Sequence, residues 1–280
     1  MQHERIDSHQ HFWIKPQPDE YIWMGPDHRD IMHDFLPGDL EPILKRNKIN
    51  RTVAVQAAVT EKEAEFLFQL ADENPIIAGV VIWMDMESPL FGNQLHRYRQ
   101  HTPFKGIRPM IALDPDVNWM LHKQVKASFR LLAEWDVCFD FLVFPRHLPN
   151  VLKILDEFKG LRAVIDHIGN PSIKNREWEP WATLMKHLAS HENVYCKLSG
   201  MISQADHLAW RSEDFSPYIR YLAEVFEPER LMFGSDWPPC QLLGGYDRMF
   251  EALLLNLEGL TTHEQDDVLG NTACKFYRLT

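Results

Sequence analysis

A pair of histidines in the segment IDSHQHFW, residues 6–13, is the first pattern in the chain that suggests chemistry. His9 and His11 are two residues apart, so both side chains point to one face if the segment is a strand. Neutral imidazoles, together with a carboxylate, are the ligands that zinc and similar divalent ions prefer. One histidine alone is more simply explained as a hydrogen-bonded core residue. The pair therefore raises the question of which other ionisable groups the fold brings to it.

Further polar side chains stand at or just after the ends of apolar runs. They are Arg108, Arg146 and His147, Asp166 and His167, Lys197 and Ser199, and Asp236. If these runs are the parallel strands of a barrel, their ends share one rim, where barrel enzymes place the active site. For His9, His11 and Asp236 taken together we therefore favour a site over three separate core roles.

The apolar runs themselves indicate the architecture. They span residues 6–12, 52–59, 77–84, 104–111, 137–144, 162–169, 194–200 and 230–236. Several are apolar on both faces, which is typical of a parallel sheet covered by helices. Amphipathic stretches lie between them, such as residues 118–135 and a helix starting after Thr60, where Glu63 has the capping-box spacing.

Eight such units predict an α/β protein with a single distorted (β/α)8 TIM barrel over residues 1–280. An open doubly wound sheet is the competing architecture, but no glycine-rich phosphate loop follows the first run. One connection, residues 13–38, is longer than barrel loops usually are. We expect it to lie over the mouth of the barrel, either as a lid on the ligand or as a packed cap.

Composition excludes several classes of partner. The net charge is -11 and no Lys/Arg cluster occurs, so we expect no nucleic-acid partner. The longest apolar stretch, IIAGVVIWM, is too short to span a bilayer, and the first residues have no apolar signal region. The four cysteines form no CxxC pair and suggest reduced thiols, so we expect a cytoplasmic protein. The oligomeric state stays open.

Four motifs together resemble a known family. They are DSHQHFW at 7–13, VIDHIGNP at 164–171, VYCKLSG at 194–200 and LMFGSDWP at 231–238. In this order the chain resembles the amidohydrolase superfamily, and within it the branch of L-fuconolactone and L-rhamnonolactone hydrolases and 2-pyrone-4,6-dicarboxylate lactonase. The HxH motif alone is weak evidence, whereas HxH followed by DHxGxP and GSDWP is specific for this branch. The resemblance covers nearly the whole chain.

The resemblance implies a distorted (β/α)8 barrel whose site residues come from the first, sixth and eighth strands. By position, His9 and His11 match the first-strand pair, His167 the sixth-strand histidine and Asp236 the eighth-strand aspartate. Binuclear members carry a bridging lysine or glutamate at the end of a middle strand. Here that end carries Arg108, and the usual fifth-strand histidine is replaced by His147 after the strand. We therefore expect one divalent ion, Zn or Mn, at His9, His11 and Asp236, or catalysis without metal.

The reaction implied is the hydrolytic opening of a lactone, most simply that of a sugar acid of the L-fucono or L-rhamnono type. Asp236 acts as general base, and His167 stabilises the oxyanion if no metal does so. Arg108 is expected to bind substrate, because its guanidinium suits a carboxylate or neighbouring hydroxyls; a tie to Asp114 or Asp116 is the alternative. Further expected substrate contacts are His147, Gln56, Trp83 and Lys197.

Two other functions remain open from the sequence. A metal-dependent decarboxylase of the same superfamily shares the HxH pair and the eighth-strand aspartate, but its sixth strand usually reads more like HGGG than DHIGNP. A sugar-binding barrel without activity is disfavoured, because the set of His9, His11, His167 and Asp236 is intact.

Neighbours of the expected site are interpreted as supporting residues. Asp166 is expected to point away from His167, its neighbour in a strand, and Asp7 to orient His9. Ten other histidines are interpreted as structural or solvated, with His28 and His33 left uncertain because they lie in the long loop. The ten are His3, His28, His33, His96, His101, His122, His187, His191, His207 and His263.

Overall fold

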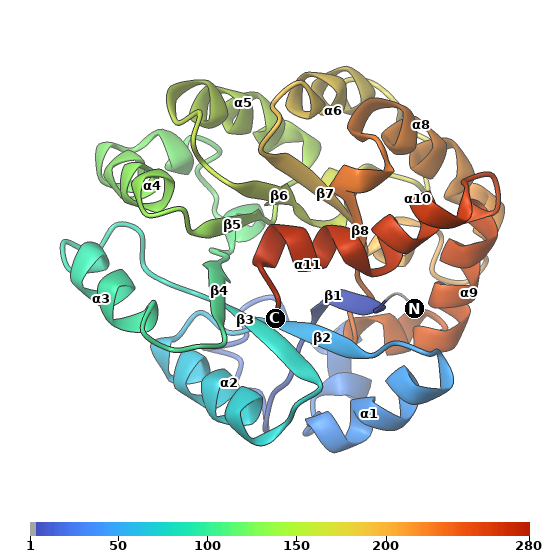
Figure 1. Cartoon of the computed structure of the whole chain (residues 1–280), viewed down its shortest axis with the longest axis horizontal. Coiled ribbons are helices and arrows are strands. Elements are labelled where there is room, and N and C mark those ends of the chain that lie inside the picture. The colour runs from blue at the N-terminus through green and yellow to red at the C-terminus, as the bar shows by residue number, and fades with distance from the viewer. Residues whose placement is uncertain (1–3) are drawn as a thin grey trace.

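The computed structural model describes residues 4–280, so His3 lies outside the described part. Eight parallel strands form one sheet whose order follows the chain, β1-β2-β3-β4-β5-β6-β7-β8 (Figure 1). Gln10 also pairs with Trp237 beyond the end of β8, so the two edges of the sheet meet. The predicted (β/α)8 barrel is therefore confirmed, and the open doubly wound sheet is wrong. The strands are β1 Ile6–Gln10, β2 Arg51–Val55, β3 Ile77–Ile82, β4 Phe104–Ile107, β5 Cys138–Phe141, β6 Ala163–Ile165, β7 Val194–Leu198 and β8 Leu231–Phe233.

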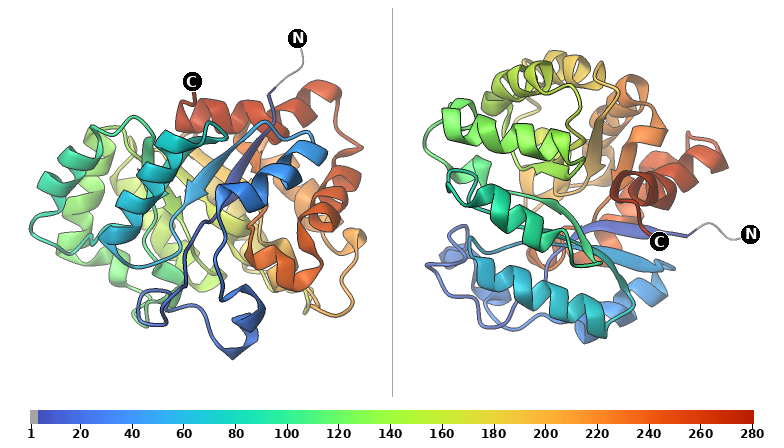
Figure 2. Two further views of the ribbon diagram at one scale, coloured as in Figure 1. Left: turned by 90° about the horizontal axis from the view of Figure 1, so that it is seen from below. Right: turned by 60° about the vertical axis from the view of Figure 1, so that its left-hand side comes forward.

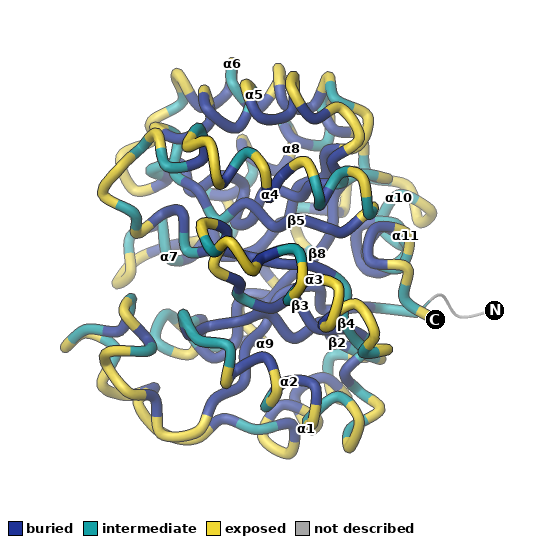
Figure 3. Tube along the Cα trace, turned by 90° about the vertical axis from the view of Figure 1, so that its left-hand side faces the viewer, coloured by how far each residue is buried: buried dark blue, intermediate teal, exposed yellow. Residues whose placement is uncertain are grey.

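The helices surround the strands and turn their apolar faces inward, so that buried residues lie toward the sheet and exposed ones toward solvent (Figure 3). They are α1 Pro37–Arg46, α2 Glu61–Glu73, α3 Phe91–Tyr98, α4 Lys123–Glu134, α5 Leu148–Glu157, α6 Trp181–Ala189, α7 Met201–Gln204, α8 Ser216–Phe226, α9 Gly245–Leu257, α10 Thr262–Asp266 and α11 Thr272–Tyr277. None of the helices in residues 4–280 is long and apolar enough to cross a membrane.

A separate apolar cluster fills the barrel at the end where the strands begin. Its strand residues include Ile6, Val53, Val81 and Val164, and Phe276 of α11 packs onto them. Helix α11 lies across this end of the barrel, and the segment between β1 and α1 lies at the opposite end (Figure 2). The candidate site therefore lies at the opposite end of the barrel, where the strands end.

Several predicted boundaries of strands and helices are wrong. The fourth and sixth strands were expected to reach residues 111 and 169, but β4 ends at Ile107 and β6 at Ile165. Beyond β6 the chain turns, and His167, with a φ of 53°, is aimed by that turn rather than by strand alternation. The expected helix at 118–135 is broken at His122, whose backbone is extended between a short 3₁₀ turn and α4.

The expected capping box at the start of α2 is also only half right. The Thr60 side chain accepts from the amide of Lys62, as an N-cap does. The Glu63 carboxylate does not return to the Thr60 amide. It is buried and accepts hydrogen bonds from the amides of Ala57 and Ala58, at 2.9 to 3.0 Å. Glu63 therefore fixes the chain where it leaves β2.

The long segment after β1 is tied to itself by backbone pairing. Trp13 and Phe35 form an antiparallel bridge, and the Trp13 indole donates to the carbonyl of His33 at 2.9 Å. Between them lies the 3₁₀ helix Pro26–Ile31. The four cysteines are free, three of them buried and Cys274 half-buried, as expected of reduced thiols.

Candidate active site

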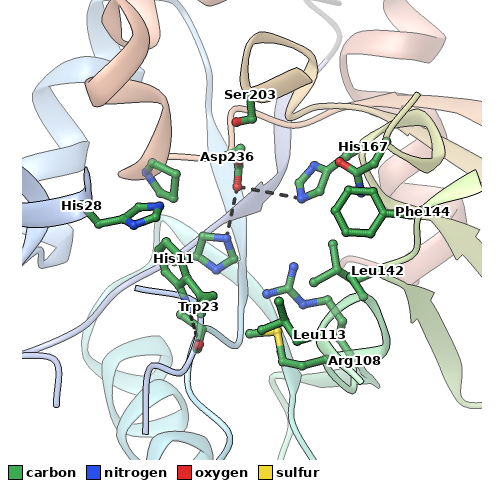
Figure 4. A pocket seen from close by; sticks show the side chains of 15 residues that line it. His11, Trp23, His28, Arg108, Leu113, Leu142, Phe144, His167, Ser203 and Asp236 are labelled. Atoms are coloured by element: carbon green, nitrogen blue, oxygen red, sulfur yellow. Dashed lines mark hydrogen bonds and ion pairs between the residues drawn. The ribbon is translucent and has the colours of Figure 1, made fainter. Parts of the chain in front are cut away.

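Three imidazoles surround the carboxylate of Asp236 at the mouth of the barrel, and Figure 4 shows two of them, His11 and His167. Its Oδ1 lies 3.4 Å from His11 Nε2, 3.9 Å from His9 Nε2 and 4.0 Å from His167 Nε2. All four residues are nearly buried; Asp236 is 8% exposed and His167 7% exposed. The structure thus brings together the four residues that the sequence singles out from three distant segments.

The backbone around Asp236 explains how the carboxylate is aimed. Asp236 has a φ of 55°, a conformation that residues other than glycine adopt rarely and mainly at functional sites. Its amide donates to the carbonyl of His9 at 2.8 Å, and the amide of His11 donates to the carbonyl of Trp237 at 2.8 Å. Gly234 is needed here, because a side chain would come within 2.6 Å of the His9 Cβ. The HxH and GSDWP segments therefore hold each other in register.

Asp7 supports this joint by a different route from the one expected. Its carboxylate accepts from the amides of His9 and Ser235, at 3.2 and 2.9 Å, and from the hydroxyl of Tyr246 at 3.1 Å. It therefore fixes the backbone of His9 rather than the imidazole. Burial raises the pKa of the Asp7 carboxyl to about 6, although these hydrogen bonds oppose the rise.

His167 reaches Asp236 because the chain turns sharply after β6. Its φ is 53°, and the following Ile168 has a φ of 51°. Its Nδ1 is hydrogen-bonded to the Ser199 hydroxyl at 2.8 Å. Gly200, with a φ of 59°, leaves the space that the imidazole fills, because a Cβ there would collide with the His167 ring. The position of His167 therefore requires both Ser199 and Gly200, the last two residues of the VYCKLSG motif.

The same turn makes one prediction wrong. Asp166 was expected to point away from His167, but both side chains reach the site, because His167 leaves the strand direction at a φ of 53° in the 3₁₀ turn that follows β6. The Asp166 carboxylate instead enters the barrel and lies 3.4 Å from His9 Nδ1 and 3.0 Å from the Lys197 ammonium. The Nδ1 of His9 thus lies beside a carboxylate, and it is also 3.1 Å from the Lys197 Nζ.

Arg108 is buried next to these groups. Its Nη1 lies 3.1 Å from His9 Nε2 and 3.4 Å from Asp166 Oδ2, and its Nη2 donates to the carbonyl of Gln56. The alternative of a tie to Asp114 or Asp116 is therefore wrong. Arg108 Nε is buried without a hydrogen-bond partner within residues 4–280, so one donor of this guanidinium is left unsatisfied.

A buried charge network lies beneath the site. Lys197 is fully buried and donates to Asp140 Oδ2 at 2.6 Å, and the hydroxyl of Tyr277 donates to the same oxygen at 2.6 Å. Burial opposes ionisation of Asp166, but Lys197, His9 and Arg108 outweigh it and hold its pKa well below the ordinary value. Asp140 was not among the predicted site residues, although a carboxylate inside the apolar run VCFDFLVF is itself a signal, since buried charges need partners.

A cavity of about 220 Å³ opens above the histidines and Asp236. Arg108 forms part of its wall, together with Trp23 and His28 from the long segment after β1 (Figure 4). Further lining side chains come from the segments that follow β4, β5, β6 and β7, the last of them from α7. They are Met110, Leu113, Leu142, Phe144, Asn170 and Ser203. Of the two histidines left uncertain, His28 thus reaches the site.

Four residues expected to bind substrate do not line this cavity. Gln56 donates its side-chain amide to the Arg108 carbonyl at 2.7 Å, and Lys197 lies beneath the site. His147 is turned back to its own chain, where its Nδ1 accepts from the Phe144 amide at 3.0 Å. Trp83 lines a neighbouring cavity. A direct role for these four in substrate binding stays a prediction.

Electrostatics in the site favour neutral imidazoles beside an ionised carboxylate. Burial lowers the pKa of His11 and His167 below the ordinary value. Burial opposes ionisation of Asp236, but the neighbouring His167 and His11 outweigh it and lower its pKa. A neutral histidine can accept or donate a proton, and the carboxylate stays charged over the pH range in which most enzymes act.

These residues fit a divalent ion. The ligand atoms of His9, His11 and Asp236 lie within 4.8 Å of one another. His11 Nδ1 is bonded to the carbonyl of Val55 at 2.8 Å, so in the neutral ring the proton sits on Nδ1 and the Nε2 lone pair faces the carboxylate. At 3.4 Å, this Nε2 and the Asp236 oxygen can share a proton, or they can both bind one metal cation. The donor set of imidazole nitrogens and a carboxylate is one that zinc prefers.

The amidohydrolase family model matches residues 6–279, so the chain belongs to the amidohydrolase family. The L-fucono-1,5-lactonase of Burkholderia ambifaria is 36% identical over 284 residues, which cover 98% of this chain and 96% of that protein. The expected family is thereby confirmed.

Solved structures agree with the fold. An amidohydrolase from Burkholderia multivorans, crystallised with bound zinc, is 32% identical and superposes with a TM-score of 0.91 over 99% of this chain and 100% of its own. A 5-carboxyvanillate decarboxylase from Sphingomonas paucimobilis superposes with a TM-score of 0.70 over 99% of both chains, but only 12% of residues are identical. That second likeness shows the fold alone and gives no support to a decarboxylase.

Proposed function

We propose that this protein hydrolyses the lactone of a sugar acid, of the type that its 36% identical relative is named for. The observation that carries the proposal is the Asp236 carboxylate, which lies within 4.0 Å of His9, His11 and His167 on the floor of the cavity. A carboxylate and neutral imidazoles around a small cavity can activate water and stabilise the charge that develops on an ester carbonyl.

The side chains at the base of the cavity can carry out each proton transfer that lactone hydrolysis needs. Water attacks the lactone carbonyl carbon, and Asp236 takes the proton of that water as general base. The imidazole of His167 stabilises the oxyanion. When the tetrahedral intermediate collapses, the bond between the carbonyl carbon and the ring oxygen breaks. The proton held by Asp236 then passes to the ring oxygen, which leaves as the hydroxyl group of the open acid.

A single divalent ion, zinc or manganese, is the cofactor that His9, His11 and Asp236 fit, and when bound it would supply a Lewis acid that polarises a carbonyl oxygen. The side chains that line the walls of the cavity would orient the substrate. Arg108 offers the unsatisfied Nε donor, and Trp23 gives an apolar face on the side of the long segment. His28 lies beside Trp23, with ring centroids 5.3 Å apart. We therefore assign the segment 13–38 a role in closing the mouth over the substrate.

Initial rates on a panel of sugar lactones, dicarboxylate lactones and aromatic acids test the proposal, before and after chelation and with metal analysis of the protein. Opening of a sugar lactone supports it. Loss of that activity on chelation, restored by zinc or manganese, identifies the ion as a cofactor, and survival assigns the chemistry to Asp236 and His167 alone. Release of carbon dioxide from an aromatic acid without any lactone opening contradicts the proposal.

A further inference from the structure

A second cavity, of about 340 Å³, lies beside the catalytic one and shares Met110 and Leu113 with it. These two residues follow β4, so one stretch of chain forms the partition between the cavities. The other walls come from the end of β3 and from the loop that leads to α4, where Trp83 and Trp119 contribute indoles. A ligand anchored over Asp236 that extends past Leu113, which is 43% exposed, would enter this second cavity.

Trp83 is the feature of this cavity that points to a ligand. It follows β3 directly and is only half-buried. Within residues 4–280 its indole nitrogen makes no hydrogen bond, whereas the indole of Trp119 donates to Glu87 at 3.2 Å. A half-buried indole that lines a cavity and has a free N–H offers both apolar contact and a donor, the combination by which Trp binds ligands that are apolar on one side and polar on the other.

The polar atoms of the cavity are acceptors. Asp85 Oδ1 accepts from the amide of Glu87 at 2.9 Å, and Asp114 Oδ1 accepts from the amide of Asp116 at 2.8 Å. Within the described residues, the second oxygen of each of these carboxylates bonds to no other side chain. Carboxylate oxygens are acceptors only, so their partners in a ligand are hydroxyl or amine donors.

Charge narrows the ligand class. The lining contains Asp85, Glu87 and Asp114 but no lysine, arginine or histidine. A phosphate or carboxylate group would therefore be repelled, in a chain whose net charge is already -11. The remaining lining is mostly apolar, with Ile22, Met84 and Ile111 among the side chains. Apolar walls with a few directed acceptors suit a neutral ring that carries hydroxyl groups.

We propose that this second cavity is a subsite for a neutral sugar ring joined to the lactone, so that the enzyme accepts lactones of glycosylated sugar acids. This proposal rests on the proposed lactonase function and extends its substrate class. It also gives Trp83 a place in substrate binding, outside the catalytic cavity.

The test compares L-fuconolactone, or the parent sugar lactone with the highest rate, with the same lactone carrying a glucosyl group on each free hydroxyl in turn. At least one glucosylated lactone is expected to have a kcat/KM equal to or above that of the parent. Trp83→Ala is expected to lower that value about tenfold, or about 1.4 kcal/mol, and to leave the parent within about twofold. Asp85→Asn is also expected to lower kcat/KM for the glucosylated lactone.

Trp135→Ala is the matched control, because Trp135 is also half-buried but lines a cavity bounded by β4, β5 and α11 at the other end of the barrel. This variant is expected to leave kcat/KM unchanged for both substrates. The subsite is overturned if kcat/KM for every glucosylated lactone is more than about tenfold below that of the parent. It is also overturned if Trp83→Ala lowers kcat/KM equally for both substrates while the protein keeps its normal melting temperature. Absence of turnover of any parent lactone overturns the proposed function, and this extension with it.

Discussion

The guanidinium Nη1 of Arg108 lies 3.1 Å from the Nε2 of His9, on the side of the imidazole that faces Asp236. A guanidinium can only donate, so the Nε2 lone pair of His9 faces Arg108. The other ring nitrogen, Nδ1, lies 3.4 Å from the Asp166 carboxylate and 3.1 Å from the Lys197 ammonium. A guanidinium and a divalent ion therefore compete for one electron pair. The end of β4 therefore places a positive charge beside the candidate ion site.

Arg108→Met is therefore expected to raise the affinity of the metal-free protein for zinc, by about tenfold or more, because it removes a buried cation next to the ligands. Calorimetric titration of chelator-treated protein with zinc measures the change. Arg99→Met, which removes an exposed arginine on the outer surface, is the control and should leave the affinity unchanged. An unchanged or weaker affinity in Arg108→Met would show that the guanidinium does not compete with the ion.

Asp236→Asn is expected to lower kcat by roughly a thousandfold, because the amide keeps the shape of the carboxylate but cannot take a proton from water. Steady-state rates on the best lactone measure the loss, and thermal unfolding checks that the fold is intact. Asp72→Asn, an exposed aspartate on α2, is the matched control. An Asp236→Asn enzyme with full activity would remove Asp236 from the mechanism.

Ser199→Ala is expected to lower kcat by about tenfold with little change in KM, since the hydroxyl only holds the His167 ring through a 2.8 Å hydrogen bond. Nitrogen chemical shifts of His167 in labelled protein should show a change in the tautomer balance, which a purely structural serine would not produce. Ser203→Ala, at a serine that lines the cavity without touching His167, serves for comparison. A normal kcat with an unchanged His167 signal would argue against positioning by Ser199.

The fold and the centre of the site follow from the sequence because both depend on local rules. Apolar runs alternating with amphipathic stretches predict the barrel, and the barrel brings strand ends to one rim. His9, His11 and Asp236 could therefore be grouped although more than 200 positions separate the histidines from the aspartate. Their predicted grouping agrees with distances of 3.4 and 3.9 Å in the structure.

The surroundings of the site could not be predicted, because they depend on turns and on partners distant in sequence. Asp166 faces the barrel interior as Val164 does two residues before it, whereas His167 joins it at the site only because the chain turns there at positive φ. The partner of Lys197 is Asp140 on another strand, and nothing in the spacing of the two residues indicates this. Trp23 and His28 enter the cavity from a long connection whose course the sequence does not dictate.

Glu63 leads to a prediction about stability. Burial raises the pKa of its carboxyl to about 8 from an ordinary value of 4.5, while the amides of Ala57 and Ala58 oppose the rise. The folded protein then binds a proton that the unfolded chain has already lost between these two values. The free energy of unfolding should therefore be greatest below pH 4.5 as far as Glu63 is concerned, and should fall by up to about 1.4 kcal/mol per pH unit toward pH 8.

Glu63→Gln is expected to abolish this slope, because the amide does not titrate, and to lower stability at low pH, because its NH₂ group would face a backbone N–H that now has an acceptor. Denaturant unfolding at several pH values between about 5 and 8.5 measures both effects. Glu65→Gln on the same helix, where the side chain is exposed, should keep the wild-type slope. If Glu63→Gln and wild type show the same dependence on pH, the folded protein holds Glu63 ionised, and its carboxylate anchors the end of β2 as a charge rather than as an acid.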